Sequence, residues 1–288
     1  IGTLGVRLLC LRGLAVPPAL EKRVLLLAGL GTAAFLELGI LAFCLRCEDV
    51  LQLPFGKFLY GDLSPISGGT RFGTAFIAMT LGFALVAAFV YLSWLLDRVD
   101  LLWPPLLLAV GFASGISLSG HDAVDPGSFW ATEVADWFHL VAASLWVGGL
   151  LALVLAVWPT GGAIRNEGFV QFSRLATWVV AITLGAGTYL SIVRLPHLHD
   201  LWRTGYGQTL LVKLALVAAA LLFGAVHHFV VRPRLERADA TFIVRAGRSL
   251  AVELGLAIAV LLVAAVLTDS KPPTPPGAIA NAAAAVSR

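Results

Sequence analysis

Seven stretches of this sequence are each apolar over about 20 residues, the length that an α-helix needs to cross a bilayer. In hydrocarbon every backbone N–H and C=O must be paired within the protein, and a helix pairs them within its own segment. The sequence therefore predicts an all-α fold, a polytopic bundle of transmembrane helices joined by short loops. The predicted spans cover residues 23–45, 71–96, 101–119, 132–158, 171–194, 208–231 and 247–268.

The composition agrees with a membrane protein. Hydrophobic residues make up 59% of the 288 residues and charged residues only 13%, whereas about a quarter of the residues of a soluble domain are charged. The net charge of +3 is small, and the sequence has no basic patch interleaved with aromatic residues. We therefore expect the lipid bilayer, and no nucleic acid, as a partner.

The two ends of the chain differ from its middle. Residues 1–16 are apolar but short and contain Arg7 and Arg12, which is typical of the last turns of an incomplete span, so that about eight spans are expected in all. Residues 271–288 are rich in Pro and then in Ala, and we expect them to form an extended or disordered tail. Residues 1–270 are expected to form a single transmembrane helix-bundle domain.

Lys and Arg indicate the orientation, because short cytoplasmic loops retain them. Loops rich in Lys and Arg alternate along the chain with loops that are poor in them. The loops poor in Lys and Arg cover residues 47–70, 121–136 and 196–207. We expect these loops and the C-terminal tail on the periplasmic or extracellular side. The residues that mark the inner side are Arg12, Lys22, Arg23, Arg98, Arg165, Arg174, Arg232, Arg234, Arg237, Arg245 and Arg248.

Two histidines lie near the outer ends of neighbouring spans. His121 follows the span that ends at residue 119, and His139 lies roughly 10 Å along the next helix at 1.5 Å per residue. Asp122 adjoins His121, and Asp136 shares a helix face with His139. Imidazole and carboxylate groups are ligands of transition metals, so these four residues are a candidate metal site. The alternative is that they only form hydrogen bonds and solvate a turn.

Several consecutive blocks of the chain resemble one family. The blocks read SGHDAVD, ADWFHLVAASLWVGGLLAL, FSRLATWVVAITLGAGTYLS, GYGQTLLVKLALVAAALLFGAVHHFVVRPRL and RSLAVELGLAIAVLLVAAVLTDSKPP. Together they cover roughly residues 110–275. Over this core the sequence resembles the copper-resistance protein D family, of the CopD, PcoD and YcnJ type.

The resemblance implies a bacterial inner-membrane protein that moves copper between periplasm and cytoplasm, often beside a small periplasmic copper-binding protein of the CopC type. On the family pattern His121 and His139 match motif histidines. Asp122 stands where the family usually has a small residue, which adds a potential oxygen ligand. His227 and His228 stand where the family commonly has asparagine or another polar residue.

Two further pairs are candidate ligands. His197 and His199 form an H-x-H in an outer loop and could supply two ligands to one ion, although a solvated loop would look the same. Cys44 and Cys47 form a C-x-x-C motif at the outer end of a span. They could bind Cu(I), form a disulfide or have no functional role. The chain has one methionine, so a thioether ladder for copper is excluded and histidine and carboxylate groups would have to hold the ion.

Three ionisable residues lie inside the predicted spans. Glu37, Lys213 and Glu253 are expected to face the bundle or an aqueous path, since intramembrane charges are costly and often functional. We regard them as candidate relays for protons or cations. His227 and His228, near the inner end, are read as an exit site, a haem ligand or a polar helix end.

Two other functions remain open. Histidines on facing helices could ligate a b-type haem, which would make the protein a redox or assembly factor. The chain could also be a structural or sensing subunit. It has no G-x-x-x-x-G-K-[ST] motif for ATP, and we expect it to be an enzyme only if it binds haem.

Overall fold

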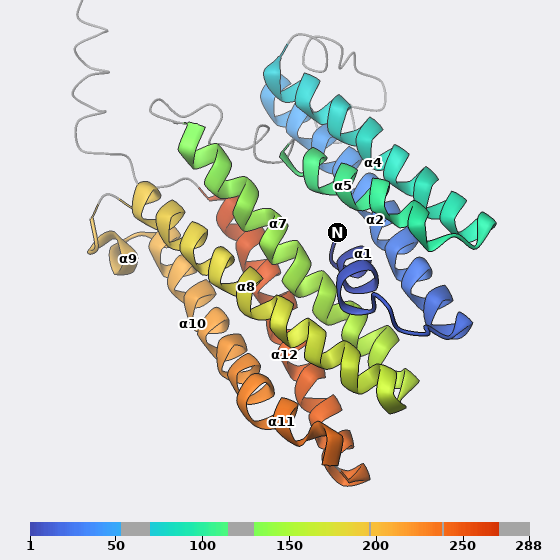
Figure 1. The fold of residues 1–288 in the computed structure, drawn as a ribbon. Helices are drawn as coiled ribbons and strands as arrows, with labels where there is room; N and C mark the ends of the chain where they lie inside the picture. The colour runs from blue at the N-terminus through green and yellow to red at the C-terminus, as the bar shows by residue number, and fades with distance from the viewer. Residues whose placement is uncertain (53–69, 115–129, 196, 238, 271–288) are drawn as a thin grey trace, which may run out of the picture. The chain divides into compact units, whose positions relative to one another are not determined.

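The structure, a computed structural model, describes residues 1–52, 70–114, 130–195, 197–237 and 239–270. The regular elements of these residues are all helices, without a strand. Six of the described helices are long and apolar enough to cross a membrane, and Val99–Phe112 forms a shorter apolar helix (Figure 1). The prediction of an all-α, polytopic membrane helix bundle is confirmed.

The predicted spans correspond to these helices. Six lie within the long helices, and the span predicted at 101–119 corresponds to the shorter one, although residues 115–119 lie outside the described residues. The incomplete N-terminal span is helical over α1 (Gly2–Gly5) and the π-helix η1 (Val6–Cys10).

Large apolar side chains cover the outside of the helices. Leu81, Trp178 and Phe229 are 66%, 73% and 74% exposed. A soluble protein rarely exposes apolar side chains in such number, because water penalises them. In a lipid bilayer the same side chains are well solvated, so the exposed surface agrees with a multi-pass membrane protein.

The described chain divides into two compact units, Ile1–Ala186 and Gly187–Arg288. In the first unit, α4 packs against α2 and α5, and these three helices lie side by side (Figure 1), while α1 packs against α7. Buried apolar residues such as Phe83, Val86 and Leu106 form its core. The single domain over residues 1–270 stays a prediction. The elements of this unit after η1 are α2 (Pro18–Leu51), α4 (Arg71–Leu96), η3 (Val99–Leu102), α5 (Trp103–Phe112), α7 (Trp130–Ala152), η5 (Leu153–Val157), η6 (Trp158–Thr160) and the greater part of α8 (Gly162–Arg194).

In the second unit, α10 packs along α12, and the short helix α9 packs against α10. Tyr206, Leu210 and Leu267 are buried together where α10 begins and α12 ends. The elements are the end of α8, α9 (Asp200–Arg203), α10 (Gly205–Val226), the π-helix η7 (His227–Val231), α11 (Arg232–Arg234), η8 (Leu235–Arg237) and α12 (Ala240–Asp269).

Polar side chains mark the beginnings of three long helices. The Thr70 hydroxyl accepts a hydrogen bond from the Gly73 N–H at the start of α4, at 2.9 Å. Asp239 accepts one from the Phe242 N–H at the start of α12, at 2.6 Å. Thr204 caps α10 in the same way. Such caps satisfy backbone donors that a helix leaves unpaired in its first turn.

Candidate functional site

His139 lies on α7 with its imidazole turned toward α8. Its Nδ1 atom lies 2.9 Å from the carbonyl oxygen of Thr183, and its side chain is half-buried. A carbonyl oxygen only accepts, so Nδ1 carries the hydrogen and donates it. In the neutral ring the lone pair is then on Nε2. This is the arrangement in which proteins present a histidine to a metal, since the second hydrogen bond fixes both ring orientation and tautomer.

Between residues 134 and 146 of α7, the neighbours of His139 are apolar or aromatic, apart from Asp136 and Ser144. Asp136 is half-buried one helical turn before His139. Trp137 donates a hydrogen bond from Nε1 to the carbonyl oxygen of Val110 at 2.8 Å, which ties α7 to α5. Trp146, seven residues after His139, is 5% exposed. The structure therefore places Asp136 and His139 one turn apart on one helix. Large apolar side chains flank them on this helix.

His121 and Asp122 lie outside the described residues. The metal site that the sequence predicts from His121, His139, Asp122 and Asp136 therefore stays a prediction. The two described residues of this site, Asp136 and His139, offer one carboxylate and one imidazole, which are two of the four proposed ligands.

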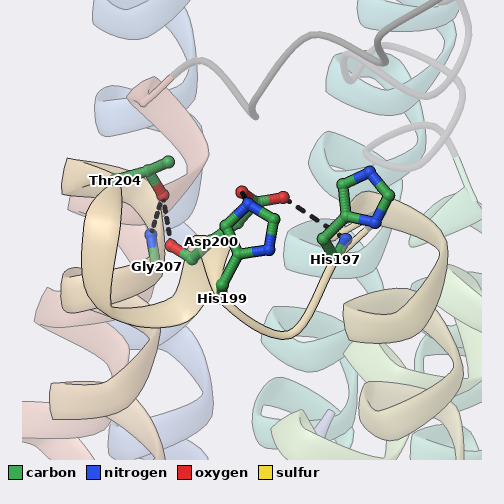
Figure 2. Close-up of polar contacts among 5 residues, drawn as sticks. All are labelled: His197, His199, Asp200, Thr204 and Gly207. Atoms are coloured by element: carbon green, nitrogen blue, oxygen red, sulfur yellow. Dashed lines mark hydrogen bonds and ion pairs between the residues drawn. The ribbon is translucent and has the colours of Figure 1, made fainter.

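His197 and His199 lie in the second unit, in the loop before α9. Their rings stack at a centroid distance of 5.3 Å with an interplanar angle of 8°. His199 Nε2 lies 3.3 Å from Asp200 Oδ1, and the backbone N–H of His197 donates to Asp200 Oδ2 at 3.3 Å. Figure 2 shows the Asp200 carboxylate between the two histidines. The loop thus gathers two exposed imidazoles and one carboxylate within four residues.

Thr204 and Gly207 fasten this loop to α10. The Thr204 hydroxyl donates to the Asp200 carbonyl oxygen at 2.7 Å and accepts from the Gly207 N–H at 3.0 Å (Figure 2). A Cβ atom at Gly207 would collide with the Asp200 carbonyl oxygen and lie 2.5 Å from Leu201 Cα. Glycine at this position therefore lets α9 lie directly on the first turn of α10.

No group of three or more His, Cys, Asp and Glu residues is arranged to hold a metal ion within the parts of the chain that the structure describes. The Asp200 contact of His197 is made by its backbone N–H and not by its ring. A copper ion in this loop would therefore need the His197 side chain to turn, or a ligand from elsewhere.

Cys44 and Cys47 are free thiols on α2. Cys47 lies beyond the apolar span, and burial, together with the neighbouring Cys44, raises the pKa of its thiol. Because the thiolate is the form that binds metal, this environment weakens Cys47 as a copper ligand at neutral pH.

The three candidate relay residues have different surroundings. Glu37, on α2, is exposed, and Lys213, on α10, is half-buried. Glu253, on α12, is 5% exposed. A relay role for Glu37 and Lys213 stays a prediction.

Glu253 contacts His227, which is 4% exposed. His227 Nδ1 lies 2.5 Å from Glu253 Oε2, and His227 Nε2 lies 2.9 Å from the hydroxyl of Ser249. Reasoning from the sequence missed this pairing and Ser249 altogether. A signal was present, because His227 lies five residues before Arg232 and Glu253 lies five residues after Arg248, so both have the same distance from the basic ends of their helices.

Comparison with known proteins gives the family. A model of the family described as Copper resistance protein D matches residues 167–267. Over 210 residues, the chain is 32% identical to Copper resistance protein D of Pseudomonas syringae pv. tomato, a match that covers 67% of this chain and 66% of that protein. Over 176 residues, it is 32% identical to Copper transport protein CutJ of Bacillus subtilis (strain 168), which covers 60% of this chain.

The chain spans about a third (31%) of the Bacillus protein and about two thirds (66%) of the Pseudomonas protein. No solved structure matches it. The family match includes α10 and α12, and the resemblance that the sequence motifs carry is confirmed. The chain belongs to the copper-resistance protein D family.

Proposed function

We propose that this chain is a copper transport protein of the bacterial inner membrane. It binds copper on the periplasmic side at a site that contains His139 and Asp136 on α7 together with His121 and Asp122, and passes the ion across the bilayer. The loops rich in Lys and Arg face the cytoplasm, and the C-terminal tail lies on the periplasmic side.

The orientation of His139 is the observation that carries this proposal. Its Nδ1–H donates to the Thr183 carbonyl oxygen, so Nε2 is the ring nitrogen with the lone pair. A histidine in an apolar membrane helix is costly unless its polar atoms are used. Imidazole is a common ligand of copper, and the relatives of this chain are named for copper transport and copper resistance; we therefore propose that His139 ligates copper.

The loop of His197, His199 and Asp200 has the chemistry of a first capture site. Imidazole and carboxylate groups bind copper ions, and both rings are exposed. An exposed loop of this kind also suits exchange with a soluble copper carrier, for which a periplasmic CopC-type protein is the candidate partner.

The haem alternative would use the same histidines as the copper site. At His227, both ring nitrogens are engaged, by Glu253 and by Ser249, so an iron bond at that residue would have to break one of these contacts. We propose copper as the cargo because the relatives are named for copper transport and copper resistance, and we propose transport as the activity of the chain.

Metal analysis with an absorption spectrum of the detergent-purified protein tests the proposal. The variants are His121→Ala and His139→Ala, and His228→Ala is the matched control, because His228 is outside the proposed site. We expect the parent and the control to bind the same amount of copper, and either test variant to bind about one copper ion per chain less.

Two results would contradict the proposal. A copper content in both test variants equal to that of the parent would move the site elsewhere. A preparation without copper, but with a haem absorption band that disappears in the test variants, would replace copper by haem.

A further inference from the structure

His227, Glu253 and Ser249 form a buried polar group between η7 and α12. Glu253 Oε2 and Ser249 Oγ each contact one ring nitrogen of His227, at 2.5 Å and 2.9 Å. The imidazole and the carboxylate are both about 95% buried, since their residues are 4% and 5% exposed. The group lies inside two helices that are long and apolar enough to span a membrane.

The hydrogen-bond chemistry of this group allows two charge states with the same positions of the heavy atoms. Two acceptors do not approach to 2.5 Å, so a proton lies between Nδ1 and Oε2. If the group holds only this proton, Nε2 is an acceptor, the Ser249 hydroxyl donates to it, and the net charge is −1. If a second proton is bound, Nε2–H donates to the same hydroxyl and the net charge is 0.

The Ser249 hydroxyl can form a hydrogen bond with His227 Nε2 in both charge states. A serine hydroxyl is both a donor and an acceptor and rotates to suit its partner. Both charge states are therefore fully hydrogen-bonded, and neither leaves a buried polar atom of this group unpaired. A group built only to hold two helices together would not need a partner that accepts both states.

The group lies just inside the apolar part of the spans. His227 is five residues before Arg232, and Glu253 is five residues after Arg248, which is roughly 7 Å along a helix at 1.5 Å per residue. Ionisable side chains at such positions are rare in membrane proteins and recur in the proton relays of transporters.

The charged neighbours of the group come from both helices. On α12, Glu253 contacts the imidazole, and Arg245 and Arg248 are exposed toward the basic end. After His227 the chain continues with His228 and Arg232, both half-buried. These are the charged and titratable side chains nearest to the group along the two elements that form it.

Glycine and a π-helix shape the site. A Cβ atom at Gly224, three residues before His227, would lie 3.4 Å from Glu253 Oε1, so the backbone of Gly224 lies close to the carboxylate. His227 is the first residue of the π-helix η7, and such turns are frequent at functional sites.

We propose that His227, Glu253 and Ser249 form a binding site for one exchangeable proton, and that its loading and release couple proton movement to the cation movement proposed above. The proton is taken up from water on one side of the membrane onto Nε2 and is released from it to water on the other side. The coupling rests on the proposed transport function, whereas the proton site itself does not.

Nitrogen NMR of the full chain in lipid, with ¹⁵N-labelled histidine and no added metal, tests the proton site. The signals of His227 are identified with His227→Asn. We expect Nε2 of His227 to change from a bare to a protonated nitrogen on acidification, and Glu253→Gln to remove this change from the same pH range. The control Ser191→Ala should leave it unaltered, because the Ser191 hydroxyl only bonds the Gly187 carbonyl oxygen of its own helix.

Copper uptake into proteoliposomes with and without an imposed pH gradient tests the coupling. We expect the gradient to change the uptake rate of the parent and of Ser191→Ala, and we expect Glu253→Gln to lose this dependence. Ser249→Ala, which keeps the His227–Glu253 contact, should reduce the response to the gradient.

The outcomes separate the two proposals. If Nε2 keeps one protonation state throughout, or if its change persists in Glu253→Gln, the proton site is wrong. If Glu253→Gln takes up copper with the same gradient dependence as the parent, the coupling is wrong. If the parent takes up no copper while Nε2 still titrates with Glu253, the proton site holds and the transport function, with the coupling, is overturned.

Discussion

Gly148 on α7 and Gly2 on α1 bring the backbones of two helices into direct contact. A Cβ atom at Gly148 would lie 3.1 Å from Gly2 Cα, and a Cβ atom at Gly2 would collide with the backbone of Gly148 and Gly149. In lipid there is no hydrophobic force between helices, so close packing of small residues is a main source of helix association. The contact fastens α1 to the helix that carries His139.

Gly2→Ala should therefore destabilise the protein. Its methyl group meets backbone atoms, which cannot move aside, and overpacking of this kind costs about 1–3 kcal/mol. Gly29→Ala is the matched control, because a Cβ atom at Gly29 on α2 meets nothing within 4 Å. Thermal unfolding in detergent, followed by tryptophan fluorescence, should show a lower Tm for Gly2→Ala alone. An equal Tm for both variants would contradict the close contact.

The ion pair of Arg7 and Glu21 predicts a second effect on stability. Arg7 Nε lies 2.7 Å from Glu21 Oε2, and the two side chains are 11% and 13% exposed. Removal of one partner of a buried pair leaves an uncompensated charge and costs about 3–5 kcal/mol. Arg7→Met should therefore lower the Tm strongly, and the double variant Arg7→Met/Glu21→Leu should recover most of the loss.

The exposed pair of Arg98 and Asp100 provides the control for this cycle. Its atoms lie 3.7 Å apart, and its side chains are 64% and 86% exposed. Exposed pairs contribute about 0–1 kcal/mol, so Arg98→Met should leave the Tm nearly unchanged. If the Tm change of the double variant Arg7→Met/Glu21→Leu equals the sum of the changes in the two single variants, Arg7 and Glu21 are not coupled.

The helices of this protein were predictable because apolar length alone determines a membrane span. Six of the seven complete spans lie in helices long enough to cross. The partners of the polar residues were not predictable in the same way. Thr183 is 44 residues from His139, and Ser249 is 22 residues from His227, so those contacts depend on how helices pack and rotate against each other.

The candidate site shows the same limit. Asp136 and His139 both lie on α7, where residues three apart share a helix face, as their spacing predicts; their role as metal ligands stays a prediction. The engagement of both His227 ring nitrogens, in contrast, follows from the meeting of η7 with α12. The sequence indicated that Glu253 was costly in the membrane, and its distance from Arg248 matched the distance of His227 from Arg232. Only the packing of the helices shows that the two side chains meet.

Gly207→Ala should loosen the loop that carries His197 and His199. The added methyl group would collide with the Asp200 carbonyl oxygen, which the Thr204 hydroxyl holds. Gly205→Ala is a control two residues away, because a Cβ atom at Gly205 meets nothing within 4 Å. Amide hydrogen exchange over α9 should become faster in Gly207→Ala by roughly tenfold, the effect of about 1.4 kcal/mol of local stability. Similar exchange in both variants would contradict this packing.

The double variant His197→Ala/His199→Ala should weaken the capture of copper and not its passage. Both imidazoles are exposed beside Asp200, so the double variant removes the two proposed ligands at the loop and leaves the residues of α7 in place. We expect the copper concentration for half-maximal uptake to rise by roughly tenfold, which corresponds to about 1.4 kcal/mol of binding, with an unchanged maximal rate. His228→Ala is the control for loss of a histidine elsewhere in the same unit.

Gly207→Ala in the same uptake assay separates ligation from a general need for the loop. It keeps both histidines but displaces α9, so a capture site that depends on the position of this loop predicts a rise in the half-maximal concentration, as in the double variant. If the double variant and the parent have the same half-maximal concentration, the loop does not bind copper. If the double variant loses its maximal rate instead, His197 or His199 takes part in passage, and the division between capture at this loop and transfer at His139 is wrong.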